Sequence, residues 1–499
     1  MEMQFDRISV PYLQKLTDRL CSQEQTQEVR LPDGMPDVGR ILGAWGQVVV
    51  RSKEWGSGMM TLSCGVMAWV LYTPEDGEGV HSVEAWLPFT MKWELPETRY
   101  DGKILASCLL KNVDARSTSA RKLMVRANLE AVGEAWQTME AQVATPAAVP
   151  ADIAVLTASY PVLLPKEAGE KAFFIEEQLS LPSNCPSMDK MMHYSLQPEI
   201  LEKKVMAGKV VFRGVGKVHI LYRGEDRRLY TWDCELPFSQ YADLEGEYDG
   251  EPELSVRPCV TSLDISVDEN GELLLKAGLL GQFLLWDRTV VTVAEDAYSP
   301  CRELTLNHEE LELPAVLDQV TQIVQSEKSV QADAQQIVDV TFCPCFGEAE
   351  RGEDGITLSL PGQMQMLYYD PEGMLQTVAA SCEGKWYLPT AADCVVEARM
   401  SPIGKPQAIP GAGNVNLRAE MNVDAVVTAG QGIPMVVGME MGETEKPDPN
   451  RPSLILCRAG KRRLWDVAKE SGSTVEAIKR ANGLQAEPDG NAVLLIPVK

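Results

Sequence analysis

The chain has 499 residues, of which 45% are hydrophobic, and a formal net charge of −26. This length predicts about three or four domains with hydrophobic cores of their own. The excess of carboxylates argues against a nucleic-acid-binding protein, because such proteins need a basic surface to neutralise phosphates. Residues 1–11 have no apolar segment of the signal-peptide kind, and no apolar run is long enough to span a membrane. We therefore expect a cytoplasmic protein whose cysteines are free thiols.

Residues 1–26 form a polar leader at the start of the chain. Leu13, Leu16 and Leu20 are spaced for one face of a short helix. We predict a helix that packs on the first domain, and a peptide that binds a partner is the alternative.

One strand pattern occurs three times, at residues 123–129, 273–279 and 415–421. Each copy reads aliphatic, x, aliphatic, basic, Ala, x, aliphatic, and strict alternation predicts a long β-strand with one buried face. The central alanines lie 150 and 142 residues apart, which is a domain length and predicts duplicated domains. The basic residues are expected on an exposed face, with an ion pair to a nearby acid as the alternative; they are Arg126, Lys276 and Arg418.

Two further matches help to delimit the repeats. The pattern Leu-Pro-x-x-x-Pro opens residues 31–42 and 181–192, and its paired prolines favour a rigid extended segment before the next strand. An apolar strand that ends in Tyr occurs at residues 65–72, 216–222 and 362–368, and turn-forming residues follow each copy as in hairpins.

The predicted fold is therefore mostly β, with three tandem β-sandwich-like or barrel-like repeats. We place the repeats at residues 27–143, 175–300 and 329–441, and the third lacks the Leu-Pro-x-x-x-Pro pattern. Residues 301–328 are predicted as an acidic linker capable of forming a helix. Residues 442–452 are polar and rich in proline, as an exposed semi-rigid linker should be.

The composition changes after this linker. Residues 451–499 hold nine Lys/Arg and five Asp/Glu, so this segment is basic in an otherwise acidic chain. Such charge asymmetry indicates an independent module. The pattern over residues 453–499 predicts a strand, two short helices and a closing strand, which is a small α+β (βααβ) unit.

The residues of this C-terminal module resemble those of a known domain family. Gly460, residues 464–469 and 473–479, Asn482 with Leu484, and the final Ile496-Pro497 resemble a LysM domain. With this module behind duplicated β-rich domains, the acidic chain resembles the SipL-like spore-coat morphogenetic proteins of endospore-forming bacteria. That resemblance implies action on the mother-cell side of the forespore surface. It also implies a protein partner, the basal morphogenetic ATPase of the spore coat.

The first loop of this module departs from the family pattern. LysM domains that bind N-acetylglucosamine chains usually carry Gly-Asp-Thr-Leu-Trp there, whereas residues 460–465 read Gly-Lys-Arg-Arg-Leu-Trp. A solvated basic loop and a contact with an acidic protein surface fit this change equally, and both fit it better than glycan binding does. The predicted partner- or glycan-binding loops contain Gly460, Lys461, Arg462, Arg463, Leu464, Trp465, Asn482, Gly483 and Leu484.

We predict no catalytic residues, no cofactor and no metal site. The four histidines share no metal or triad spacing, and His219 is expected to face solvent from a strand. Cys343 and Cys345 lack the second close pair that a structural zinc site needs.

The sequence therefore favours a non-enzymatic scaffold or adaptor of spore-coat assembly whose LysM-like module binds a protein. A peptidoglycan-binding protein that uses the LysM groove is the alternative.

Overall fold

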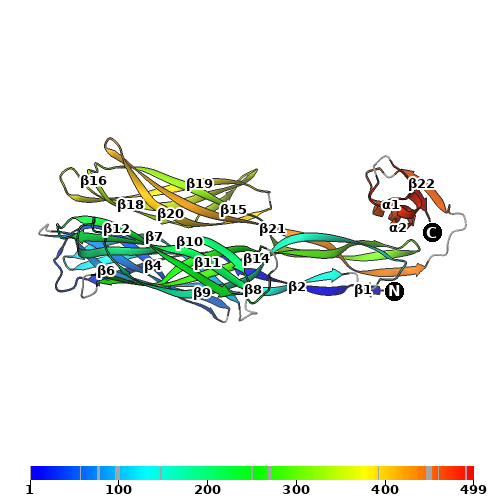
Figure 1. The fold of residues 1–499 in the computed structure, drawn as a ribbon, viewed down its shortest axis with the longest axis horizontal. Helices are drawn as coiled ribbons and strands as arrows, with labels where there is room; N and C mark the ends of the chain where they lie inside the picture. Colours follow the sequence, from blue (N-terminus) through cyan, green and yellow to red (C-terminus); the bar gives the residue numbers. More distant parts are fainter. Residues whose placement is uncertain are drawn as a thin grey trace.

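The computed structural model describes residues 2–56, 58–75, 79–95, 102–145, 149–248, 251–267, 272–391, 393–444, 452–458, 460–488 and 492–498. A broad body of β-sheets narrows into a stalk, and a small module with two helices lies at the far end of that stalk (Figure 1). The chain is mostly β, as the alternating patterns predict. In the described residues no helix is long and apolar enough to cross a membrane.

Lobe 1 (residues 2–145) holds two antiparallel sheets. One has the strand order β4-β5-β6, and in the other β8 pairs with β7 on one side and with β2 and β3 on the other. The strands are β1 (Glu2–Gln4), β2 (Asp6–Thr17), β3 (Leu20–Arg30), β4 (Val38–Gly56), β5 (Met59–Pro74), β6 (His81–Glu94), β7 (Lys103–Ser119) and β8 (Lys122–Thr145).

Lobe 2 (residues 154–298) has the same plan in its simplest form, with sheets β10-β11-β12 and β13-β14-β9. Its first strand therefore lies beside its last. The strands are β9 (Ala154–Leu179), β10 (Met188–Met206), β11 (Lys209–Gly224), β12 (Leu229–Asp243), β13 (Glu253–Val267) and β14 (Leu273–Tyr298).

Lobe 3 (residues 302–444) has sheets built around β18 and β21. β18 pairs with β16, β17 and β19, and β21 pairs with β15 and β20. The strands are β15 (Arg302–Gln331), β16 (Gln336–Pro344), β17 (Glu348–Arg351), β18 (Gly355–Tyr369), β19 (Leu375–Pro389), β20 (Val395–Pro410) and β21 (Asn414–Thr444).

The helix predicted in residues 1–26 is wrong, because this segment forms β1, β2 and the start of β3. Its three leucines share no face: Leu13 and Leu16 pack into different hydrophobic clusters, and Leu20 is exposed. Pairing of β2 and β3 with β8 satisfies the backbone hydrogen bonds, and this tertiary interaction overrides the local helical spacing.

The helical linker predicted at residues 301–328 is also wrong. These residues lie in β15, which pairs with β21 from Arg302 opposite Thr444 to Gln331 opposite Asn414. Leu311 and Leu313 are buried while the glutamates between and beside them are exposed, which is the two-residue period of a strand. The acidic side chains thus cover the outer face of lobe 3. Of the linker predicted at residues 442–452, the first three residues end β21, and residues 445–451 lie outside the described part.

The strand pattern that occurs three times opens the long strands β8, β14 and β21. Its apolar positions are buried, including the three central alanines, Ala127, Ala277 and Ala419. Each basic residue lies on the outer face and meets an acid on the neighbouring strand, which is β3 in lobe 1, β9 in lobe 2 and β15 in lobe 3. The pairs are Arg126–Glu24 at 3.7 Å, Lys276–Glu176 at 3.1 Å and Arg418–Glu327 at 3.5 Å.

The Tyr and Pro patterns meet in lobes 1 and 2. The Tyr72 hydroxyl donates a hydrogen bond to the Pro36 carbonyl oxygen at 3.0 Å, and Tyr222 makes the same bond to Pro186 at 3.1 Å. The second proline of the Leu-Pro-x-x-x-Pro pattern is therefore held against the strand that ends in Tyr.

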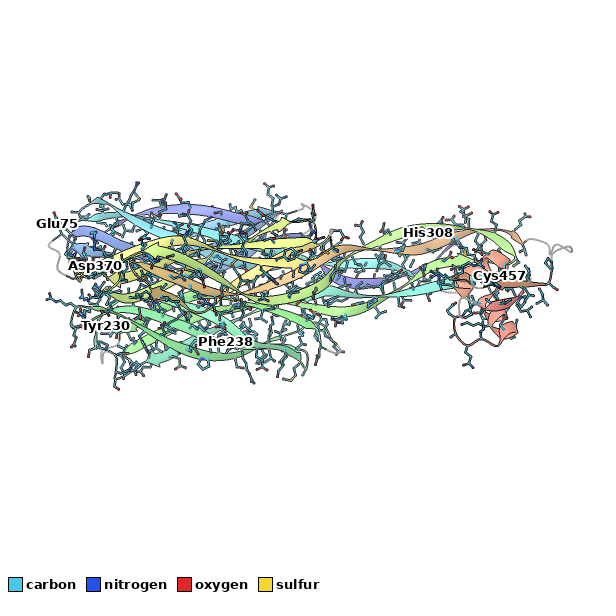
Figure 2. All side chains as sticks on the ribbon, turned by 90° about the horizontal axis from the view of Figure 1, so that it is seen from above. Glu75, Tyr230, Phe238, His308, Asp370 and Cys457 are labelled. Carbon is cyan, nitrogen blue, oxygen red and sulfur yellow. The ribbon has the colours of Figure 1, made fainter. Side chains whose placement is uncertain are left out.

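The stalk consists of the outer halves of the long strands. β2 pairs with the end of β8, β9 with the end of β14, and β15 with the end of β21. A two-stranded ribbon alone is marginally stable in water, but these three ribbons share one core that includes the fully buried Val143, Val293 and Met439. β1 also pairs with β21, so the first strand joins lobe 1 to lobe 3. In Figure 2, His308 marks the stalk, and Glu75, Tyr230 and Asp370 mark the opposite end of the body.

The C-terminal module (residues 453–498) has the order β22 (Leu454–Arg458), α1 (Leu464–Ser471), α2 (Val475–Asn482) and β23 (Val493–Pro497). β22 and β23 pair antiparallel. Thr474 caps α2 by accepting a hydrogen bond from the Ala477 N–H, and Gly472 and Gly483 end the helices in the left-handed conformation.

Candidate functional site

The C-terminal module packs against the stalk tip of lobe 2. Tyr298, at the end of β14, meets Trp465 of α1 edge to face, with ring centroids 4.7 Å apart. Ala154 and Leu156, at the start of β9, pack against the same cluster of module residues. The first strand and the last strand of lobe 2 thus form one platform for α1.

Asp296 of lobe 2 is the polar centre of this contact. Its carboxylate accepts hydrogen bonds from the Trp465 indole N–H and from the Lys469 ammonium group, both at 2.8 Å. Burial would raise the pKa of Asp296, but these two hydrogen bonds and the charge of Lys469 outweigh it and lower the pKa. Arg463 lies 3.7 Å from Glu295 at the rim of the contact.

The basic loop of the module therefore divides into two parts. Arg463 and Trp465 face lobe 2, whereas Lys461 is exposed and Arg462 pairs with Glu470 of its own module at 2.7 Å. Gly460 has a φ of 63°, a left-handed turn that favours glycine. The loop therefore contacts acidic residues of the same chain, Glu295 through Arg463 and Asp296 through Trp465.

The second predicted loop has a structural role in the module. Asn482 donates to the Ile478 and Leu495 carbonyl oxygens and accepts from the Leu495 N–H, at 2.7–2.8 Å, which ties α2 to β23. Gly483 is the left-handed cap of α2, and Leu484 packs against the module core.

Glu487, which follows the second predicted loop in the chain, binds the first. Its carboxylate accepts a hydrogen bond from the Leu464 backbone N–H at 2.9 Å, and Asp466 accepts one from the Arg463 N–H at 3.2 Å. These two acids cap the N-terminus of α1, a place that favours negative charge.

The outer face of the two-stranded sheet in the module is exposed and mostly apolar, and it also carries the exposed Arg458. Leu454 is 53% exposed, Leu456 71% and Val493 56%. The register places Leu456 opposite Leu495 and Arg458 opposite Val493, so these side chains share one face. The other face, which includes Leu494 and Ile496, packs on the helices.

A cavity of about 1210 Å³ lies where the three lobes meet. It is lined by side chains from every lobe, among them Gln47 and Trp136 of lobe 1, Arg257 of lobe 2, and Glu397 and Arg399 of lobe 3. The charged groups pair with one another: Lys15 with Glu397, and both arginines with the buried Glu134. Burial lowers the pKa of Arg257 and of Arg399 to about 10, so both remain charged at neutral pH.

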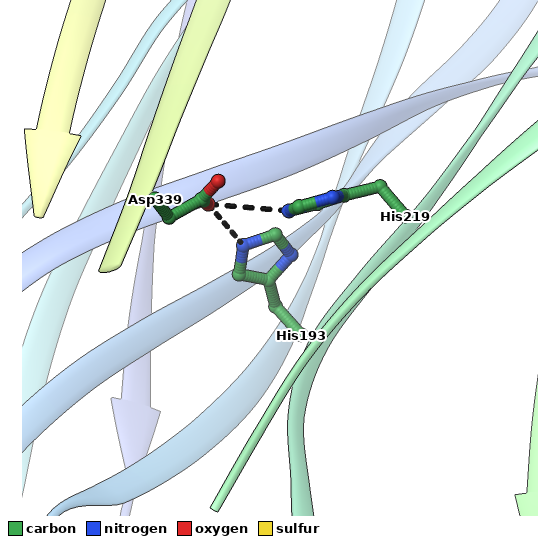
Figure 3. Close-up of side chains that lie close together, drawn as sticks. All are labelled: His193, His219 and Asp339. Carbon is green, nitrogen blue, oxygen red and sulfur yellow. Dashed lines mark hydrogen bonds and ion pairs between the residues drawn. The ribbon is translucent and has the colours of Figure 1, made fainter. Parts of the chain in front are cut away.

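A second polar cluster lies between lobes 2 and 3. His193 of β10, His219 of β11 and Asp339 of β16 direct their side chains toward one point (Figure 3). Asp339 Oδ2 lies 3.2 Å from His219 Nε2 and 3.8 Å from His193 Nε2. The other ring nitrogen of His219, Nδ1, is 2.8 Å from Asp233 Oδ1, and the His193 ring stacks on Trp45 of lobe 1 with centroids 5.3 Å apart.

The pKa values of the two histidines in this cluster shift in opposite directions. Burial lowers the pKa of His193, and the Asp339 carboxylate does not compensate. Burial also opposes the charge of His219, but Asp339 and Asp233 outweigh it and raise the pKa to about 9. Burial would raise the pKa of Asp339, but the charge of His219 and the interactions with both histidines outweigh it and hold the pKa below its usual range. The expectation that His219 faces solvent is wrong, because pairing with Asp233 and Asp339 holds it at the lobe junction.

Sequence reasoning missed the platform on lobe 2 and the histidine cluster. His193 and His219 lie on adjacent strands and Asp339 comes from another lobe, so no short spacing joins them. Asp296 and Tyr298 lie at the end of the alternating strand β14. No local motif in the sequence marks them as contact residues.

The comparison with known families finds a match within lobe 2. Residues 187–268 match the family model described as SipL, SPOCS domain. The matched segment runs through β10 to β13 of lobe 2, and it includes His193 and His219. No curated protein and no solved structure matches the chain. The SPOCS-domain match supports a similarity to SipL-like proteins and suggests that this is a sporulation-related protein.

Proposed function

We propose that this protein is a non-enzymatic scaffold of spore-coat assembly and that its C-terminal LysM-like module binds a protein partner. The observation that carries this proposal is the exposed apolar face of Leu454, Leu456 and Val493 at the far end of the stalk from the body. A contiguous apolar face on a small module favours an interface with another protein.

The partner follows from the resemblance to SipL-like proteins. It is the basal morphogenetic ATPase of the spore coat, and the site of action is the mother-cell side of the forespore surface. In this arrangement the stalk holds the module away from the broad body of the protein. The contact between α1 and lobe 2 fixes which face of the module points outward.

Peptidoglycan binding through the groove of the module has less support. Glu487 is hydrogen-bonded to Leu464 in the first of the loops that would border a glycan, and Trp465 is turned toward Asp296 and Tyr298 of lobe 2. A pull-down on purified peptidoglycan tests this alternative. Strong retention that chitin oligomers compete away would favour the glycan over the protein partner.

The test of the proposed function is localisation in a sporulating cell. A chain that lacks residues 453–499 should no longer gather at the forespore. The double variant Leu456→Glu, Val493→Glu should have the same effect, because it places two charges on the apolar face and leaves the module core intact.

The matched control is Leu317→Glu, Val290→Glu, which makes the same changes at exposed positions of the stalk strands β15 and β14. This control should localise as the unaltered chain does. Normal localisation of the truncated chain would reject the proposal.

A further inference from the structure

We propose that His193, His219 and Asp339 bind a divalent transition-metal ion, with zinc as the best fit, and that this ion joins lobe 2 to lobe 3. Two imidazoles and one carboxylate are a donor set that zinc accepts in proteins. Their ligand atoms lie within 4.8 Å of one another.

The two distances from Asp339 to the histidine nitrogens are close to those of tetrahedral coordination. With bonds of about 2.0–2.1 Å, two ligand atoms on a tetrahedral zinc ion are about 3.3 Å apart. The His219 Nε2–Asp339 Oδ2 distance of 3.2 Å already has this value. The His193 Nε2–Asp339 Oδ2 distance is 3.8 Å and has to shorten by about half an ångström, which is a small side-chain movement.

His193 supplies an independent observation. Its side chain is 3% exposed, and its Nε2 atom faces Asp339 with no hydrogen-bond partner. A buried polar atom without a partner costs free energy that a ligand would recover. The stacking of the ring on Trp45 keeps Nε2 directed toward the cluster.

Asp233 completes the arrangement. A histidine that binds a metal usually donates its other ring N–H to a carboxylate, which fixes the tautomer and the ring orientation. Asp233 Oδ1 lies 2.8 Å from His219 Nδ1, which leaves Nε2 free to coordinate. The Asp339 carboxylate would offset part of the charge of the ion, and Asp233 would offset a further part although it also pairs with Lys405. A water molecule or the second oxygen of Asp339 would take the fourth position.

The ion would act as a structural link. His193 and His219 come from β10 and β11 of lobe 2, Asp339 comes from β16 of lobe 3, and Trp45 of lobe 1 covers the cluster. Without the ion, the same three side chains form a buried ion pair between His219 and Asp339 beside a neutral His193. The experiment separates these two states.

The test uses the full chain without an affinity tag, because a histidine tag binds metal itself. After purification in metal-free buffer, elemental analysis should find about one zinc ion for each chain. Co²⁺ added to the apoprotein should give the intense visible absorption of a tetrahedral site. Zinc should also raise the thermal unfolding temperature of the apoprotein.

Three variants sharpen the result. Asp339→Asn should abolish the Co²⁺ spectrum and the thermal shift, and Asp233→Asn should weaken zinc binding about 10- to 100-fold while the three ligands remain. His308→Gln changes an exposed histidine on the stalk and should bind as the unaltered chain does. If the unaltered chain takes up no zinc and no Co²⁺, or if Asp339→Asn folds and binds them equally well, the metal site is rejected. Should Asp339→Asn fail to fold, the Asp233→Asn affinity and the thermal shift of the unaltered chain decide.

Discussion

The junction of the three lobes and the contact between the module and the stalk are built differently. At the junction, each lobe contributes to shared hydrophobic clusters, and fully buried residues such as Leu71 and Leu221 lie in one cluster with Leu367 of lobe 3. At the module, one aromatic pair and one carboxylate on the lobe 2 side carry most of the contact. The junction holds the lobes as one body, whereas the module is attached by a small contact that a few changes can release.

The same difference appears in the charged groups. Glu134 is 1% exposed and meets two arginines whose charges are also buried. Asp296 is partly exposed and meets one lysine and one indole. A buried ion pair is costly to break, because the remaining partner keeps an uncompensated charge, while a partly exposed pair can be replaced by water.

Glu134→Gln should therefore be the most damaging single change at the junction. It leaves Arg257 and Arg399 charged and without the carboxylate that pairs with both, and we expect a loss of about 3–5 kcal/mol in the free energy of unfolding. Denaturant unfolding followed by circular dichroism measures it. Glu140→Gln, at an exposed position on the same strand, should change stability little. Equal stability of the two variants would mean that the junction does not depend on this cluster.

Asp296→Ala tests the module contact. It removes the hydrogen bonds from Trp465 and Lys469, so the contact should weaken by about 1.5–3 kcal/mol, while the unfolding of the body should stay unchanged. Hydrogen exchange by mass spectrometry should show faster exchange in α1 and at the end of β14. Asp318→Ala, at an exposed position of β15, is the control. Unchanged exchange in α1 would contradict a contact centred on Asp296.

The pH dependence of this contact has a defined sign. The pKa of Asp296 is lowered from its ordinary value of 3.8 in the docked state. The charged carboxylate therefore stabilises the contact fully above that ordinary value, and the stabilisation is lost as the pH falls through the lowered pKa. The indole N–H resonance of Trp465, assigned with Trp465→Phe, should shift toward that of a free indole only in this acidic range. A shift already complete near pH 6 would contradict the assignment to Asp296.

The sequence predicts the features that follow directly from the alternation of apolar and polar residues. The buried faces of β8, β14 and β21 follow from a two-residue period, and Ala127, Ala277 and Ala419 lie inside as expected. Strands β2 and β15 were not predicted, because each is defined by pairing with a strand more than 80 residues away: Asp6 lies opposite Thr145, and Gln331 lies opposite Asn414. Because residues 301–328 are acidic, the sequence favoured a linker there. The structure instead has a strand, β15, with its acidic residues on the outer face.

The candidate sites show the same limit. The module loops were found from local residues, but the partner of Trp465 is Asp296, which lies in a different lobe. The histidine cluster needs β10, β11 and β16 to be folded before its ligands meet. Side chains that come together through tertiary contacts leave no spacing in the sequence, so a histidine such as His219 looked like an ordinary outer residue of a strand.

Lys276→Ala should have the smallest effect on the free energy of unfolding, so it serves as the reference for the changes at the lobe junction and at the module contact. Lys276 belongs to the pattern that revealed the repeats, and it pairs with Glu176 at 3.1 Å, but both side chains are more than half exposed. An exposed ion pair contributes about 0–1 kcal/mol, and salt screens it further. Denaturant unfolding of Lys276→Ala should therefore match the unaltered chain at high salt and differ little at low salt. A loss as large as that of Glu134→Gln would show that exposed ion pairs on the outer faces of the sheets contribute as much to stability as the buried cluster at the lobe junction.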